Sequence, residues 1–430
     1  MAATTPGTGA ASPDFHLKFA SVRLDDCRSN FGPTIHKTGF YWKFRRLTSG
    51  RLTKMAPNLF GTSATLYLEA SQQDVHQDKS ATEKTNAQKL IVQKSPASPS
   101  KYKWNIVWRN VIAFLYLHIG AIYGLYLFFN STMFYTFLWS IFIGLSSAVG
   151  ITAGAHRLWA HRAYKAKWPL RFFLMLCQTT AFQNHIYEWV RDHRVHHKFT
   201  DTDADPHNAQ RGFFFSHMGW LLVRKHPEVI RKGATVDMSD LERDPIVVWQ
   251  RRLYIILMPL CSFILPMWIP IHYWGEKPLN AWYSTVFRYT LSLNLTWLVN
   301  SAAHIWGMKP YDSTIGPTEN LSVAICAIGE GWHNYHHVFP WDYKAAELGN
   351  YKTNITTAFI DFCGRIGWAY DMKTVPTEVV KKRAARTGDG SKYQKGNGHT
   401  HNHEGAKWGW GDADMEPEEI KEVEILHKSE

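Results

Sequence analysis

The chain has 430 residues, which is enough for one large core or for two domains. Its formal net charge is +12, but it contains no nucleic-acid-binding motif, so we expect no nucleic-acid partner. The five cysteines are scattered without a CxxC pair, which argues against a disulfide framework and against a cysteine zinc site.

The N-terminal quarter of the chain has little hydrophobic periodicity. Residues 1–100 are rich in Ser, Thr, Ala and Gln, so we predict a disordered region there. The first long apolar run begins after residue 104, and a secretory signal peptide is therefore not expected. Met55 could be an internal start, in which case residues 1–54 would be an alternative extension.

Four apolar segments predict transmembrane helices, at about residues 111–129, 133–155, 253–274 and 281–303. The first three contain no Asp, Glu, Lys or Arg, whereas the fourth carries Arg288, whose long side chain can reach the interface. The sequence therefore predicts an all-α integral membrane protein with four transmembrane helices in two hairpins. For the third and fourth segments, a buried helical hairpin in a soluble core is the alternative.

The connections between these segments predict the topology. Sixteen Lys or Arg lie from Arg157 to Arg252, between the second and third segments. The positive-inside rule favours the cytosol for this part, and both termini then face the cytosol too. We expect residues 156–250 and 304–375 to form a cytosolic helical cap. Residues 380–430 are predicted to be a flexible cytosolic tail, in which His399, His401 and His403 form a solvated tract.

Histidines cluster where the predicted topology can bring them together. "HRLWAH" follows the second segment, "NSAAH" ends the fourth, and "HRVHH" and "HNYHH" lie in the cap. Because the second and fourth segments end at the same membrane face, their histidines lie at one depth. In each HxxHH pattern the three histidines share one helical face, whereas i and i+5 are about 140° apart on an ideal helix. HxxxxH is therefore expected to straddle a helix end.

The predicted site contains more imidazoles than one ion needs. Neutral imidazole binds iron, copper or zinc, and one zinc takes four ligands, so nine histidines indicate two metal ions. Asn300 lies one turn before His304, at the end of the fourth segment, and could hold a metal-bound water. The nine candidate ligands are His156, His161, His193, His196, His197, His304, His333, His336 and His337.

These motifs resemble those of the membrane-bound acyl-CoA desaturases of the stearoyl-CoA (Δ9) type. The resemblance covers about residues 104–375, through "GITAGAHRLWAHRAYKA", "RDHRVHHKFTDTDADPHN" and "GEGWHNYHHVFPWDY". The tail stretch "WGWGDAD" is similar to the insect branch. The resemblance implies two iron ions on the nine histidines, O2 as oxidant, and electrons from NADH through cytochrome b5 and its reductase. It also implies a cis double bond, most simply Δ9, formed in a saturated fatty acyl-CoA at the endoplasmic reticulum membrane.

The resemblance further implies a basic anchor for the coenzyme A phosphates and a narrow tunnel for the acyl chain. The small residues of Gly144 to Ala155 would leave room for that chain, although they also suit close helix packing. As a hypothesis, Gly144 permits longer substrates. The expected substrate contacts are Asn110, Asn184, Arg191, Asp192, Arg224, Lys225 and Trp297.

Two other functions remain open at this point. A membrane di-iron fatty acid hydroxylase uses similar histidine motifs and would give an alcohol in place of a double bond. A non-catalytic membrane zinc protein would bind metal without consuming O2.

Overall fold

The computed structural model of the chain describes residues 104–394 and 405–429. The predicted disorder of residues 1–100, the alternative extension 1–54 and the tract of His399, His401 and His403 lie outside the described residues.

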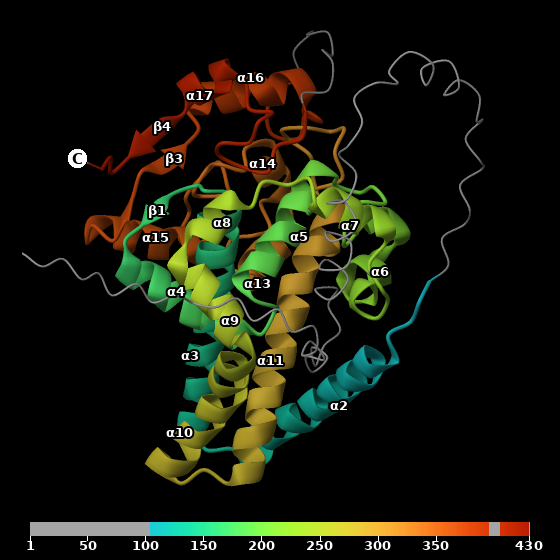
Figure 1. The fold of residues 1–430 in the computed structure, drawn as a ribbon, viewed down its shortest axis with the longest axis vertical. Coiled ribbons are helices and arrows are strands. Elements are labelled where there is room, and N and C mark those ends of the chain that lie inside the picture. The colour runs from blue at the N-terminus through green and yellow to red at the C-terminus, as the bar shows by residue number, and fades with distance from the viewer. Residues whose placement is uncertain (1–103, 395–404, 430) are drawn as a thin grey trace, which may run out of the picture. The chain divides into compact units, whose positions relative to one another are not determined.

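Long helices form where the apolar segments were predicted (Figure 1). α2 spans Trp108–Asn130, and α3 (Phe134–Val149) continues without a break into the π-helix η2 (Gly150–Ala160). α9 (Pro245–Pro259), the short π-helix η5 (Leu260–Ile264) and α10 (Leu265–Trp274) form one continuous helical rod. Within the described residues, these three stretches are long and apolar enough to cross a membrane.

The predicted fourth span differs from these three. α11 (Pro278–Asn300) has 23 residues and the expected position, but it does not reach their apolarity, because Ser, Thr, Asn and Arg288 interrupt it. α11 packs against α2, α3 and α10. The approach to α2 is close, since a Cβ added to Gly124 would lie 2.3 Å from the carbonyl oxygen of Tyr283.

The outer face of α2 is apolar. Ile112, Ile119 and Tyr126 lie seven residues apart and are 67%, 59% and 59% exposed. Exposure of such an apolar stripe to water is unfavourable, whereas the acyl chains of lipid are as apolar as these side chains. The stripe therefore suits contact with lipid.

A buried carboxylate links the turn between α2 and α3 to the turn between α10 and α11. Glu276, between α10 and α11, accepts hydrogen bonds from the backbone N–H of Met133 at 2.8 Å and from the hydroxyl of Thr136 at 2.6 Å. Asn280 donates to Glu276 at 3.0 Å and to the carbonyl oxygen of Ser131 at 2.9 Å. The ends of the two hairpins are therefore fixed to each other away from the histidines.

Short helices and two small antiparallel sheets make up the rest of the described chain, around a core that includes Tyr164, Leu170, Leu174 and Ile186. The first sheet pairs β1 (Lys165–Ala166) with β2 (Ala369–Tyr370). The helices are α4 (Trp168–Ala181), α5 (Ile186–Lys198), η3 (Ala209–Arg211), α6 (Phe213–His217), η4 (Gly219–Leu221), α7 (Pro227–Gly233), α8 (Ser239–Arg243), α12 (Ala302–Ile305), α13 (Leu321–Cys326), α14 (His333–Val338), α15 (Ile355–Arg365), α16 (Thr377–Thr387) and α17 (Pro417–Glu422).

The predicted flexible tail is largely ordered in the described residues. α16 covers its start, and residues 405–429 contain α17 and β4 (Glu424–Leu426). β4 pairs antiparallel with β3 (Met372–Thr374). Trp408 is only 3% exposed and Met415 joins an apolar cluster. Buried aromatic and apolar side chains order this segment.

Candidate metal centre

The HxxxxH histidines straddle the end of a helix, as predicted, but this helix is a π-helix: His156 lies on η2, and His161 is the residue directly after its last residue, Ala160. The N–H of His161 donates to the carbonyl oxygen of His156 at 3.1 Å, which is an i to i−5 bond. The two side chains therefore lie one turn apart on one side, where an α-helix would separate them by about 140°. Residues 150–160 are all buried, so the surrounding side chains hold this uncommon helix in place.

The two HxxHH motifs lie on α5 and α14, as helical faces that point toward His156 and His161. His304 is on the short helix α12, directly after α11. The structure thus brings all nine predicted histidines together, from four parts of the chain.

These histidines separate into two groups. Within each group the facing nitrogens lie within 4.8 Å of one another. Each HxxHH motif contributes to both groups, which its shared helical face alone did not predict. The five-histidine group is His156, His161, His193, His197 and His336, and the four-histidine group is His196, His304, His333 and His337.

The ring nitrogens inside each group face one another, but neutral imidazoles carry too few N–H groups to form a hydrogen bond at every one of these contacts. Nε2 of His336 lies 2.9 Å from Nε2 of His156 and 3.0 Å from Nε2 of His197. Nε2 of His333 lies 3.1 Å from Nε2 of His304 and 3.2 Å from that of His337. A neutral imidazole has one N–H, and several lone pairs directed at one point are the donor set that a cation requires.

The electrostatics keep most of these imidazoles neutral. Burial, followed by repulsion from neighbouring histidines, lowers the pKa of His193, His197 and His336 well below its usual range. The same causes act in the other group on His333 and His337. Neutral imidazole is the form that binds metal, so the residues present fit two metal ions.

Carboxylates behind the groups orient the rings. Glu330 accepts from Nδ1 of His156 at 2.7 Å and from Arg157 at 2.8 Å. Burial opposes ionisation of Glu330, but Arg157 and His156 lower its pKa to about 2. A carboxylate on the outer nitrogen fixes the tautomer that leaves Nε2 free for metal.

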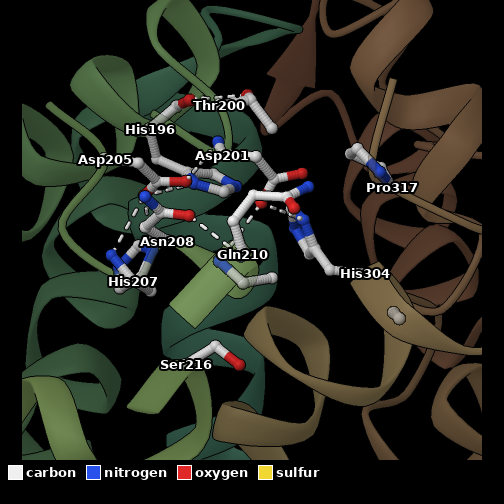
Figure 2. A network of polar contacts seen from close by, with 12 residues as sticks. His196, Thr200, Asp201, Asp205, His207, Asn208, Gln210, Ser216, His304 and Pro317 are labelled. Atoms are coloured by element: carbon white, nitrogen blue, oxygen red, sulfur yellow. Dashed lines mark hydrogen bonds and ion pairs between the residues drawn. The ribbon is translucent and has the colours of Figure 1, made fainter. Parts of the chain in front are cut away.

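The four-histidine group has a similar arrangement (Figure 2). Asp205 accepts from Nδ1 of His196 at 2.9 Å and also lies 3.4 Å from Nδ1 of His207. Asp201 lies 3.5 Å from Nδ1 of His304. Sequence reasoning missed these acidic residues, although Asp201 and Asp205 lie within the "DTDADPHN" stretch that follows α5.

Two cavities meet beside the histidines. An apolar cavity of about 280 Å³ lies between α3 and α11 and includes Gly144 in its wall. A second, more polar cavity of about 420 Å³ is lined by residues of α2, α5 and α11 and by the segment before α7. Both cavities are lined by Trp189, His193, Thr296 and Asn300. The predicted water-holding Asn300 thus stands at the junction.

The second cavity collects most of the predicted substrate contacts, namely Asn110, Asn184, Asp192, Arg224, Lys225 and Trp297. Arg191 does not line it. Arg191 instead pairs with Asp192 at 3.1 Å. Lys225 also pairs with Asp192, at 2.5 Å, and although burial opposes this, Lys225 and Arg191 lower the pKa of Asp192 to about 2. The cavity wall therefore contains an ionised Asp192 carboxylate that is paired with Lys225.

Three membrane-length helices, two buried histidine groups that could hold metal ions, and a polar cavity adjacent to an apolar one characterise this helical protein. The chain belongs to the fatty acid desaturase family, whose sequence model matches residues 131–347. Among its relatives are acyl-CoA desaturases of insects and of human, so this is an oxidoreductase family.

The similarity to individual acyl-CoA desaturases is extensive. The chain is 66% identical to the acyl-CoA Delta-9 desaturase of Acheta domesticus over 299 residues, 69% of this chain and 83% of the relative. It is 64% identical to the acyl-CoA Delta12-desaturase of the same species over 291 residues, 67% of this chain and 82% of the relative. Human stearoyl-CoA desaturase is 54% identical over 295 residues, 68% of this chain and 81% of the relative.

Proposed function

We propose that this chain is a fatty acyl-CoA desaturase that forms a cis Δ9 double bond in a saturated acyl-CoA, with O2 as oxidant. The observation that carries the proposal is the junction of the two cavities at the histidines. A polar cavity suits the coenzyme A head, an apolar cavity suits the distal acyl chain, and the metal-binding nitrogens lie where the two meet. The named activity of the 66% identical relative supports the Δ9 position.

The two histidine groups would hold one iron ion each, with Asn300 holding a water on the ion of the four-histidine group. Bound iron supplies the activation of O2 that removal of hydrogen from an unactivated methylene requires. The chain's own contribution is to turn Nε2 of each ring toward the metal, through Glu330 behind His156 and Asp205 behind His196.

The substrate would be positioned from its polar end. Arg224 and Lys225 would bind phosphate oxygens by charge-assisted hydrogen bonds, and Trp297 would lie beside the thioester. Because all methylenes of the chain have the same reactivity, the double-bond position depends on the distance between this anchor and the junction.

The cellular setting follows from the same proposal. Residues 104–375 would form the desaturase domain, with α11 as a fourth membrane span and Arg288 buried among the helices. The active site and both termini would face the cytosol at the endoplasmic reticulum membrane. Cytochrome b5, reduced by its NADH-dependent reductase, would supply the electrons.

Expression in yeast that lacks its own desaturase tests the activity. We expect gas chromatography–mass spectrometry to detect new cis-Δ9 fatty acids. A Δ11 or Δ12 product would contradict the position, and an alcohol product would indicate a hydroxylase. Iron binding without O2 consumption, in the presence of acyl-CoA and reduced cytochrome b5, would indicate a non-catalytic metal protein.

Two His→Ala substitutions test the ligand assignment, one inside the histidine groups and one outside them as its control. His333→Ala removes a nitrogen that faces two others and should abolish the new double bond. His272→Ala, on α10 and outside both groups, should leave activity unchanged. Full activity of the His333→Ala variant would contradict the ligand assignment.

A further inference from the structure

We propose that the C-terminal segment Lys407–Met415 is a positioning element of the five-histidine group, and that it holds His161 in the tautomer and orientation that bind the metal ion. This inference rests on the proposed iron binding. It assigns a role in the metal site to a part of the chain that lies far from the histidine motifs in sequence and beyond residues 131–347, which the family model matches.

The segment holds His161 from two sides. Nδ1 of His161 donates to the carbonyl oxygen of Trp408, and the N–H of Trp410 donates to the carbonyl oxygen of His161 at 2.9 Å. A carbonyl can only accept, so this contact places the imidazole proton on Nδ1. Nε2 then keeps its lone pair and faces Nε2 of His193, at 2.9 Å, inside the five-histidine group.

Gly409 permits this close approach. Its φ is +149°, and an added Cβ would lie 2.5 Å from the carbonyl oxygen of His161 and 2.6 Å from its Cα. Those neighbours are backbone atoms and cannot move aside as a flexible side chain can. A side chain at residue 409 must therefore push the Trp408 carbonyl away from His161.

Cationic side chains hold Trp408 in place. The guanidinium of Arg194 lies 4.1 Å from the centre of a Trp408 ring, and that of Arg162 lies 4.7 Å away. Arg194 is fully buried and also donates to the carbonyl oxygens of Trp159 and Ala160, next to His161. Its position is therefore fixed by the histidine-bearing π-helix, and Trp408 packs against a rigid cation.

The same segment contacts the helices of the other two motifs. Lys198, the residue after His197 on α5, pairs with Asp412 at 2.9 Å and also with Asp414. Asp412 accepts from the backbone N–H of Trp408 at 2.8 Å, which links the two contacts. Met415 packs in one apolar cluster with Tyr335 of α14. The segment thus joins all three histidine motifs from outside the metal groups.

Purified full-length protein loaded with ferrous iron tests the proposal. We expect the Gly409→Ala variant to release one of two iron ions to a chelator at least tenfold faster than wild type, because loss of an outer partner weakens a metal site by about 10- to 100-fold. Mössbauer spectra of protein loaded with ⁵⁷Fe should change for one iron environment only. Gly405→Ala is the matched control, since its added Cβ meets nothing closer than 3.8 Å.

A second variant that ends at residue 404 removes the whole segment and should lose the same ion. The proposal is overturned if both variants keep two ions with wild-type release rates. It is also overturned if Gly409→Ala loses both ions together with helix content, because the segment would then be a general structural cover. Wild-type protein that binds no iron would instead contradict the proposed function, so the two failures are distinguishable.

Discussion

Gly144 is the residue at which chain-length selection is most directly testable. It lies on α3 in the wall of the apolar cavity of about 280 Å³, and the first atoms that an added Cβ would meet are Cγ and Cδ of Arg288, at 3.6 and 4.0 Å. Those are ordinary contacts, so a side chain can begin there without moving the backbone. In Gly144→Trp, the indole would fill space that the distal methylenes of the substrate would occupy in the proposed function.

The size of the effect follows from the methylenes that lose their place. Burial of one CH2 is worth about 0.8 kcal/mol, so two methylenes are worth about 1.6 kcal/mol, which is about 15-fold at 25 °C. We therefore expect the ratio of kcat/KM for an 18-carbon over a 16-carbon acyl-CoA to fall by up to about 15-fold in Gly144→Trp.

Competition between the two substrates in microsomes, with both products measured by gas chromatography–mass spectrometry, gives this ratio directly. Phe142→Trp is the control, because Phe142 is 59% exposed and does not line the cavity. An unchanged ratio in Gly144→Trp, or an equal fall in Phe142→Trp, would refute the assignment of this cavity to the acyl chain.

Three further substitutions test the groups around the metal centre and the polar cavity. Glu330→Gln keeps the shape but removes the charge beside His156, and should weaken iron binding at the five-histidine group by about 10- to 100-fold in chelator competition. Asp205→Asn should weaken iron binding at the four-histidine group to the same extent, and the variant with both substitutions should lose both ions. If each single variant lost the same ion, the separation into two groups would be contradicted. Lys225→Gln should raise the KM for acyl-CoA by about tenfold, the value of a charge-assisted hydrogen bond, and should leave the 18:16 ratio unchanged. An equal change in KM for the free fatty acid would show that Lys225 does not act through the coenzyme A head.

The sequence was sufficient to predict the elements whose apolar or histidine residues repeat at a regular spacing. Three long apolar helices and both HxxHH helices lie where hydrophobic runs and i, i+3, i+4 spacing predicted them. The sequence also predicted that HxxxxH straddles a helix end, but it did not predict that this helix is a π-helix, because a π-helix has no propensity signal and is stabilised here by burial on all sides.

Other parts of the site depend on contacts between residues far apart in the chain. Glu330 reaches His156 across 174 positions of sequence, and the Trp408 carbonyl reaches His161 across 247. A backbone carbonyl has no residue-type signature at all. The tail was predicted to be flexible because its composition is polar and rich in Gly, yet a few buried aromatic residues were enough to order the described part of it.

The Glu276 network has a consequence for an enzyme that works on lipid. Its hydrogen bonds fix the lower ends of α3 and α11 to each other, while the histidine-bearing elements fix the upper ends, so the wall of the apolar cavity is braced at both ends. In the proposed function, this bracing would let the protein, and not the surrounding lipid, determine which acyl chains fit the cavity.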